Sequence, residues 1–232
     1  MTIFLIFTLC TILGSFFGLI IDRLPEHSIV SPRSHCENCG QILIWKDLIP
    51  IISQLINCAS CRYCKIKLTY WYSILELSCG TLFVMVWLEK VDLTFSLICL
   101  ASFLMVGFDL KTHAFPLWIW LTFFVLLSFT CPFNIGVLSC ILIAIMTEFS
   151  SLKIGSGDWL YLSLVAFSAN FFQLTLCLFV ASLSGLLYYA FNPKQKKAEM
   201  PFLPFLFLSY LCHPFFENDA LITYFSLIIF RY

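Results

Sequence analysis

Long apolar runs separated by short polar breaks dominate the chain. A helix needs roughly 20 mostly apolar residues to cross a bilayer, and several of the runs are shorter than that. Ser168-Ala169-Asn170 is the only break in the stretch from 159 to 191, which could form one helix or two. The pattern predicts an all-α fold, a polytopic membrane helical bundle of seven to nine spans. The runs lie near 2–21, 70–88, 93–108, 117–131, 135–149, 159–170, 171–191 and 202–212, with a weaker one at 221–230.

Composition supports a lipid environment. Hydrophobic residues make up 61% of the chain and charged residues 11%, whereas soluble proteins average about 45–50% and 25%. The lipid bilayer is therefore the expected surrounding. The formal net charge is zero, so no nucleic acid partner is expected.

One long polar stretch interrupts the apolar pattern and divides the chain. We expect a first transmembrane helix at 1–21, a cysteine-rich cytoplasmic loop domain at 22–69 between spans 1 and 2, and a membrane domain at 70–232. If the spans alternate, eleven of the thirteen basic residues fall on the side of the loop. Basic residues collect on the cytoplasmic side, so the N-terminus is expected outside.

Two CxxC turns lie in this loop, at Cys36-Glu37-Asn38-Cys39 and Cys61-Arg62-Tyr63-Cys64. Each turn can offer two thiolates to one tetrahedral ion, so the spacing predicts a structural zinc site made of Cys36, Cys39, Cys61 and Cys64. Reduced thiols or disulfides are the alternative, and a cytoplasmic location disfavours disulfides. Four thiolates leave no open position for water, so such a zinc would hold the fold.

Two aspartates stand at the ends of apolar runs, on the predicted cytoplasmic side. Asp109 closes the run 93–108, and Asp158 opens the next in Gly155-Ser156-Gly157-Asp158. Neighbouring carboxyl groups share a proton, so that one acts as a base on water and the other as an acid on a peptide carbonyl. This is the chemistry of aspartic peptidases. Alone, the glycine motif could equally be a turn with a capping aspartate.

Other residues are candidates for substrate binding. Gly155 and Gly157 leave room for an extended peptide near Asp158. Glu76, inside an apolar run, could recognise a substrate N-terminus or support the loop. Arg23 and Lys111 could bind anionic groups, although such residues more often anchor helix ends at the interface.

The motifs together resemble the type IV prepilin peptidases, also called prepilin leader peptidase/N-methyltransferases, of the GxGD membrane aspartic peptidases. Leu117, Leu203 and Trp159-Leu160 depart from the pattern of that family. The matching motifs are Gly14-Ser15-Phe16, Arg23-Leu24-Pro25, Ser34-His35-Cys36, Cys39-Gly40, Trp45, Asp47-Leu48-Ile49-Pro50, Ser53, Cys61-Arg62-Tyr63-Cys64, Glu76, Asp109, Gly155 to Asp158, and Pro201-Phe202-Leu203-Pro204-Phe205.

The resemblance implies a function in the inner membrane of a bacterium. Asp109 and Asp158 would cut the leader from a prepilin or a pilin-like precursor of competence or protein secretion. The loop would serve N-methylation of the new N-terminus, with S-adenosylmethionine as the methyl donor. A proton-coupled transporter and a non-catalytic scaffold with a zinc loop are the alternatives, but a transporter predicts acids at mid-membrane and inverted repeats, and a scaffold needs neither aspartate.

Overall fold

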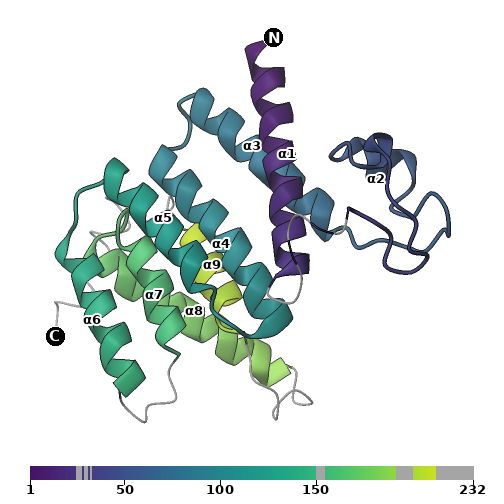
Figure 1. Cartoon of the computed structure of the whole chain (residues 1–232). Helices are drawn as coiled ribbons and strands as arrows, with labels where there is room; N and C mark the ends of the chain where they lie inside the picture. The colour runs from purple at the N-terminus through teal and green to yellow at the C-terminus, as the bar shows by residue number, and fades with distance from the viewer. Residues whose placement is uncertain (25–27, 29–30, 32, 150–154, 192–200, 213–232) are drawn as a thin grey trace. The chain divides into compact units, whose positions relative to one another are not determined.

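The computed structural model describes residues 1–24, 28, 31, 33–149, 155–191 and 201–212. This part is helical, and its isolated β-bridges join His35 to Ile42 and Ser60 to Lys67. The weak apolar run at 221–230 lies outside the described residues. The helices, shown in Figure 1, are α1 (Thr2–Arg23), the 3-10 helix η1 (Trp45–Asp47), α2 (Ile52–Ile56), α3 (Trp71–Trp87), α4 (Leu93–Thr112), α5 (Leu117–Thr130), α6 (Ile135–Phe149), α7 (Ser156–Val165), α8 (Phe171–Phe191) and α9 (Leu203–Leu211).

The all-helical prediction is confirmed, and most helix ends fall within a few residues of the apolar runs. Ser168-Ala169-Asn170 separates α7 from α8, so the stretch from 159 to 191 forms two helices. Three helices in the described part, α1, α4 and α8, are long and apolar enough to cross a membrane. Helices α3, α5 and α6 are apolar but shorter. The count of seven to nine spans stays a prediction.

The chain divides into two compact units, Met1–Ser96 and Leu97–Tyr232. The first contains α1, η1, α2 and α3, and the second contains most of α4 together with α5 to α9. The finer division into 1–21, 22–69 and 70–232 stays a prediction.

In the first unit, α1 packs along α3. Gly14 allows this approach, because a Cβ atom at this position would lie 2.8 Å from the Cα atom of Glu76 and 2.9 Å from the backbone oxygen of Leu75. Small residues let the backbones of membrane helices come this close. Gly14 therefore sets the contact between α1 and α3.

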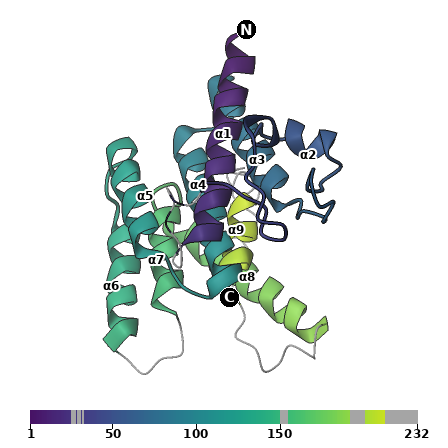
Figure 2. The same cartoon turned by 45° about the vertical axis from the view of Figure 1, so that its right-hand side comes forward.

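In the second unit, the short helix α7 contacts several others, and Figures 1 and 2 both show it beside α6. The buried hydroxyl groups of Tyr161 on α7 and Ser102 on α4 lie 2.8 Å apart and share a hydrogen bond. From α5, the Trp120 Nε1–H donates to the backbone oxygen of Leu160 at 2.8 Å. Helix α7 is thereby fixed against its neighbours by polar contacts as well as apolar packing.

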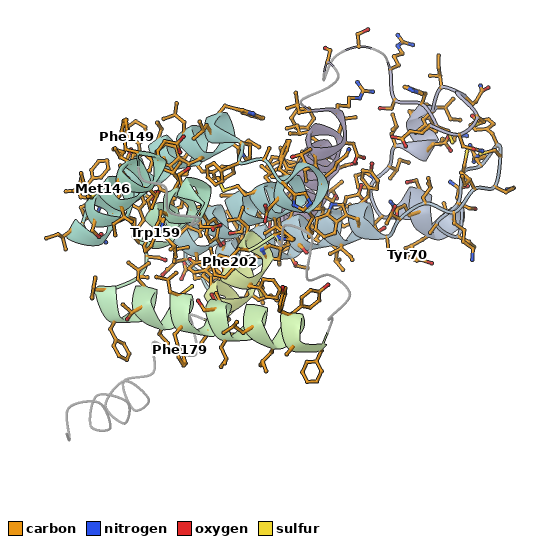
Figure 3. All side chains as sticks on the ribbon, turned by 90° about the horizontal axis from the view of Figure 1, so that it is seen from below. Tyr70, Met146, Phe149, Trp159, Phe179 and Phe202 are labelled. Carbon is orange, nitrogen blue, oxygen red and sulfur yellow. The ribbon has the colours of Figure 1, made fainter. Side chains whose placement is uncertain are left out.

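Large apolar side chains also cover the outside of the helices. Figure 3 labels Met146 and Phe149 on α6 and Phe179 on α8, and their exposed fractions are 69%, 88% and 64%. Exposed apolar surface on this scale marks contact with another apolar phase. The membrane character predicted from composition is consistent with this surface.

Candidate functional site

Asp109 lies near the C-terminal end of α4 and is half-buried. Its Oδ2 atom accepts a hydrogen bond of 3.3 Å from the backbone N–H of Leu203, the first residue of α9. The first N–H groups of a helix have no partner within the helix and attract negative charge. The start of α9 therefore stabilises the ionised form of Asp109.

Asp158 lies in the first turn of α7, outside the three helices long enough to span a membrane. Burial, and secondly the negative charge of Asp109, raise the pKa of Asp158 to about 7. The two carboxyl groups are thus close enough to interact, although 49 residues separate them in the sequence. In this pair, Asp109 accepts the hydrogen bond from Leu203, and Asp158 holds a proton more readily.

The glycines of the Gly155 to Asp158 motif shape the space around the second aspartate. Gly155 is the N-cap of α7, and a Cβ atom there would lie 3.3 Å from Oδ2 of Asp158. Gly157 faces Phe115, whose ring atom Cδ2 would lie 2.8 Å from an added Cβ. Both glycines therefore keep side-chain atoms out of the immediate surroundings of Asp158.

The four cysteines of the two CxxC turns converge. Each of Cys36, Cys39, Cys61 and Cys64 offers one sulfur, and all four sulfurs lie within 4.8 Å of one another. The Sγ atoms of Cys36 and Cys64 are 3.7 Å apart. A tetrahedral zinc ion with Zn–S distances of about 2.3 Å requires sulfurs about 3.8 Å apart. The donor set and its spacing fit zinc.

The two CxxC turns have the same local structure. In the first turn, the N–H of Gly40 donates to the oxygen of Cys36 at 2.8 Å, and in the second, the N–H of Lys65 donates to the oxygen of Cys61 at 3.0 Å. Gly40 and Lys65 both adopt positive φ, 67° and 58°. Glycine adopts this conformation freely, whereas lysine does so at a cost.

An ion pair between a partly exposed arginine and a buried carboxylate supports the second turn. Nη1 of Arg62 lies 3.3 Å from Oδ1 of Asp47, whose side chain is 6% exposed. Oδ2 of the same carboxylate accepts a hydrogen bond of 3.3 Å from the backbone N–H of Ile44, at the start of η1. Asp47 therefore ties η1 to the second CxxC turn.

Glu76, on α3, is 4% exposed. Its Oε2 atom accepts a hydrogen bond of 2.7 Å from the backbone N–H of Ile51 in the loop, and the hydroxyl of Ser15 on α1 is another hydrogen-bond partner. The carboxylate thus has partners within its own unit.

The two basic candidates stand at helix ends. Arg23 ends α1 and donates from Nη1 to the backbone oxygen of Ser28 at 3.3 Å. Lys111 is exposed in the last turn of α4, where a cation complements the partial negative charge of the helix C-terminus. The four cysteines, Glu76 and Arg23 belong to the first unit, and the aspartates, the two glycines and Lys111 belong to the second.

Known proteins resemble the N-terminal part of the chain. Residues 8–90 match the family described as "Bacterial Peptidase A24 N-terminal domain". A protein of Myxococcus xanthus named prepilin leader peptidase/N-methyltransferase is 42% identical over 79 residues, 34% of this chain and 24% of that protein. The resemblance to prepilin peptidases is confirmed.

Two further prepilin leader peptidase/N-methyltransferases show the same relationship. That of Vibrio cholerae is 40% identical over 76 residues, 29% of this chain and 30% of the relative. That of Bacillus subtilis is 38% identical over 80 residues, 34% of this chain and 32% of the relative. No solved structure matches the chain.

The extent of these matches matters for the site. The chain spans about a quarter to a third of the length of these three relatives. The family match at residues 8–90 contains the four cysteines, Arg23 and Glu76, and ends before Asp109. The family match therefore does not bear on the pairing of Asp109 with Asp158, which rests on the effect of the Asp109 charge on the pKa of Asp158.

The sequence alone does not predict some contacts of the site. The N–H of Leu203 is a backbone group, so residue type gives no sign of it, although the late proline motif marks its place in the chain. Phe115 and the ion pair between Asp47 and Arg62 were not predicted either. Asp47 and Arg62 both lie in motifs shared with the prepilin peptidases, and these motifs are the sign in the sequence that could have drawn attention to the pair.

Proposed function

We propose that this protein is a membrane aspartic peptidase that removes the leader from type IV prepilins or pilin-like precursors. The observation that carries the proposal is the interaction between Asp109 and Asp158, in which the charge of Asp109 contributes to the raised pKa of Asp158. Paired carboxyl groups that share a proton are the machinery of aspartic peptidases. The names of the relatives support the substrate class.

In the proposed mechanism, Asp109 is ionised and Asp158 is protonated at the start. Asp109 takes a proton from water as the water oxygen attacks the scissile carbonyl carbon, and Asp158 gives its proton to the carbonyl oxygen. The tetrahedral intermediate then collapses as the C–N bond breaks and the leaving amine takes a proton from Asp109. Asp158 recovers its proton from the intermediate, so the pair returns to its first state.

The glycine motif suits a peptide substrate. Without side chains at Gly155 and Gly157, an extended backbone can come near Asp158. We propose these glycines as part of a substrate site in the second unit, with Lys111 of the same unit as a further contact to the leader or to lipid. Arg23, in the first unit, is proposed separately as such a contact. The proposed location is the bacterial inner membrane, with the N-terminus outside and with the aspartates and the cysteine-rich loop on the cytoplasmic side.

The second proposed activity is N-methylation of the newly exposed residue, as in the names of the relatives. S-adenosylmethionine would supply the methyl group. Cys36, Cys39, Cys61 and Cys64 would hold a zinc ion that stabilises the loop, since a small polar segment of this kind has little apolar core of its own. With four thiolate ligands, the ion would have no position for a reactant.

Co-expression with a prepilin substrate tests the proposal. The wild type is expected to shorten the substrate on a gel, and mass spectrometry of the mature N-terminus is expected to show an added methyl group. Asp109→Asn and Asp158→Asn should each abolish cleavage, because either change removes one half of the proton exchange. Asp92→Asn is the matched control, since Asp92 is exposed near the start of α4. Full processing by either dyad variant would refute the proposal.

The sequence left two alternatives, a proton-coupled transporter and a non-catalytic scaffold. Neither is supported by the names of the relatives, which are those of processing enzymes. A scaffold also gives no reason for two interacting carboxyl groups within one unit. The cleavage assay separates all three functions.

A further inference from the structure

The loop between α1 and α3 contains a strained turn next to a buried carboxylate. Ile51 adopts φ 60° and ψ −53°, and the N–H of Ile52 donates to the oxygen of Pro50 at 2.5 Å. This is a γ-turn of the rare, strained kind. A β-branched residue seldom adopts positive φ. Such a turn persists only where surrounding contacts hold it.

Glu76 provides the contact that holds this turn. Its carboxylate, 4% exposed, accepts the N–H of Ile51 at 2.7 Å. Three residues earlier on the same face of α3, the Ser73 hydroxyl donates to Oε1 of Gln54 at 2.5 Å. Ser73 and Glu76 on α3 thus bind Gln54 and Ile51, which lie within α2 and immediately before it.

The same carboxylate also meets α1. Gly14 brings the backbone of α1 against Glu76, and Ser15 is a hydrogen-bond partner of the carboxylate. A buried charge with several hydrogen bonds is costly to free from any one of them. Glu76 therefore joins α1, α3 and the loop at one point.

We infer that Glu76 is a positioning residue, which clamps the metal-binding loop to the α1–α3 helix pair by holding Ile51 in its strained turn. The sequence offers two roles for Glu76, recognition of a substrate N-terminus and support of the loop, and this inference takes the second. The metal-binding cysteines lie on either side of the clamped segment in the sequence, so the clamp fixes where the cluster stands relative to these two helices. The inference deepens the proposed methyl transfer, and only its activity arm rests on that proposal.

Hydrogen exchange of the full chain in lipid nanodiscs tests the clamp without any assay of activity. In Glu76→Ala, the backbone amides of residues 51–57 should exchange about 10- to 100-fold faster, the range expected for loss of a hydrogen bond to a buried charge. Glu76→Gln keeps an acceptor oxygen, so the exchange rates of the same amides should stay within about threefold of those in the wild type. Leu77→Ala, at an exposed position of the same helix, is the matched control and should change nothing in this segment.

A second substitution tests the strain itself. Glycine adopts positive φ without penalty, so the double variant Ile51→Gly, Glu76→Ala should recover most of the protection lost in Glu76→Ala. Zinc content should remain that of the wild type in each variant, because the cysteines are unchanged. A loss of protection that Ile51→Gly fails to restore would overturn the role assigned to the strained turn.

Three other results would overturn the inference. One is exchange in Glu76→Ala within threefold of the wild type, and another is equal deprotection in Glu76→Ala and Glu76→Gln. Should Glu76→Ala fail to accumulate, Ser73→Ala takes its place, and its amide exchange in residues 51–57 should be about 3- to 10-fold faster than in the wild type. Unchanged exchange in Ser73→Ala is then the third result that would overturn the inference. In the activity arm, Glu76→Ala should lose methylation at least tenfold more than cleavage, and Glu76→Gln should keep both. If exchange changes as expected but the loss of methylation does not appear, the proposed function is wrong and the clamp still holds.

Discussion

The backbone N–H of Leu203 donates a hydrogen bond to Asp109 across 94 residues of sequence. Leu203 is the first residue of α9, so the bond joins a helix N-terminus to the carboxylate. Both carboxyl groups are partly buried, so this donor, and not burial, distinguishes Asp109 from Asp158, whose pKa is raised by burial and secondly by the charge of Asp109. The two aspartates therefore have different surroundings, and each of the differences can be tested.

Leu203→Pro should reduce prepilin cleavage by about 10- to 100-fold, the effect of losing a hydrogen bond to a charged group. Proline lacks the N–H but is accepted at the first position of a helix. Leu203→Ala keeps the N–H and removes most of the side chain, so it is the matched control and should retain more activity. Initial rates with purified protein measure both. Equal rates for the two variants would show that the hydrogen bond has no part in catalysis.

Gly157→Ala should impair cleavage more than Gly155→Ala. The added Cβ at 157 would lie 2.8 Å from the Phe115 ring, whereas at 155 it would lie 3.3 Å from a carboxylate oxygen. A small side chain in place of Phe115 would relieve the first clash. Phe115→Ala combined with Gly157→Ala should therefore be more active than Gly157→Ala alone, as a double-mutant cycle of kcat/KM would show. Additive losses would contradict this contact.

Cleavage should fall as the pH rises above about 7. The active pair holds one proton, and the pKa of Asp158 is raised to about 7, so higher pH removes that proton and leaves two carboxylates. A plot of kcat/KM against pH should decline about tenfold per pH unit on this limb. Size-exclusion profiles over the same range check that the protein stays folded. A rate that is constant up to pH 9 would contradict a shared proton.

The purified protein should contain about one zinc ion per chain, measured by inductively coupled plasma mass spectrometry. Cys36→Ser and Cys61→Ser should lower the zinc content severalfold, since each removes one of four ligands. Cys58→Ser is the matched control, because Cys58 lies in the same loop but outside the four-sulfur cluster. An equal effect of Cys58→Ser would contradict the assigned ligand set.

Helices were predictable because apolar runs bounded by polar breaks carry a strong signal in a membrane chain. The largest shift is at α7, which ends at Val165, five residues before the predicted end, and begins at Ser156, within the polar motif, three residues before the predicted start. A count of apolar residues does not predict that Ser156, Gly157 and Asp158 are helical, because none of the three is a large apolar residue. Three helices reach a length suited to crossing a membrane in the described part, so run length alone gave no secure number of spans.

The candidate site was predictable as far as its side chains form motifs. The CxxC turns indicated the four-sulfur cluster, because two such turns can together offer four thiolates to one ion. The contacts of Glu76 with Ile51 and of Asp109 with Leu203 involve backbone N–H groups, which every residue except proline has. Nothing in residue type distinguishes these donors, and only the fold brings them to their carboxylates.

The shortness of α7 has a consequence for hydrolysis. Its ten residues make a helix about 15 Å long, half of a hydrocarbon layer about 30 Å thick. The side chains of Tyr161, Leu162, Leu164 and Val165 on α7 are almost fully buried, so protein, and not lipid, surrounds most of its length. In the proposed function, the water that attacks the peptide bond would therefore reach Asp158 past protein side chains at the end of this short helix.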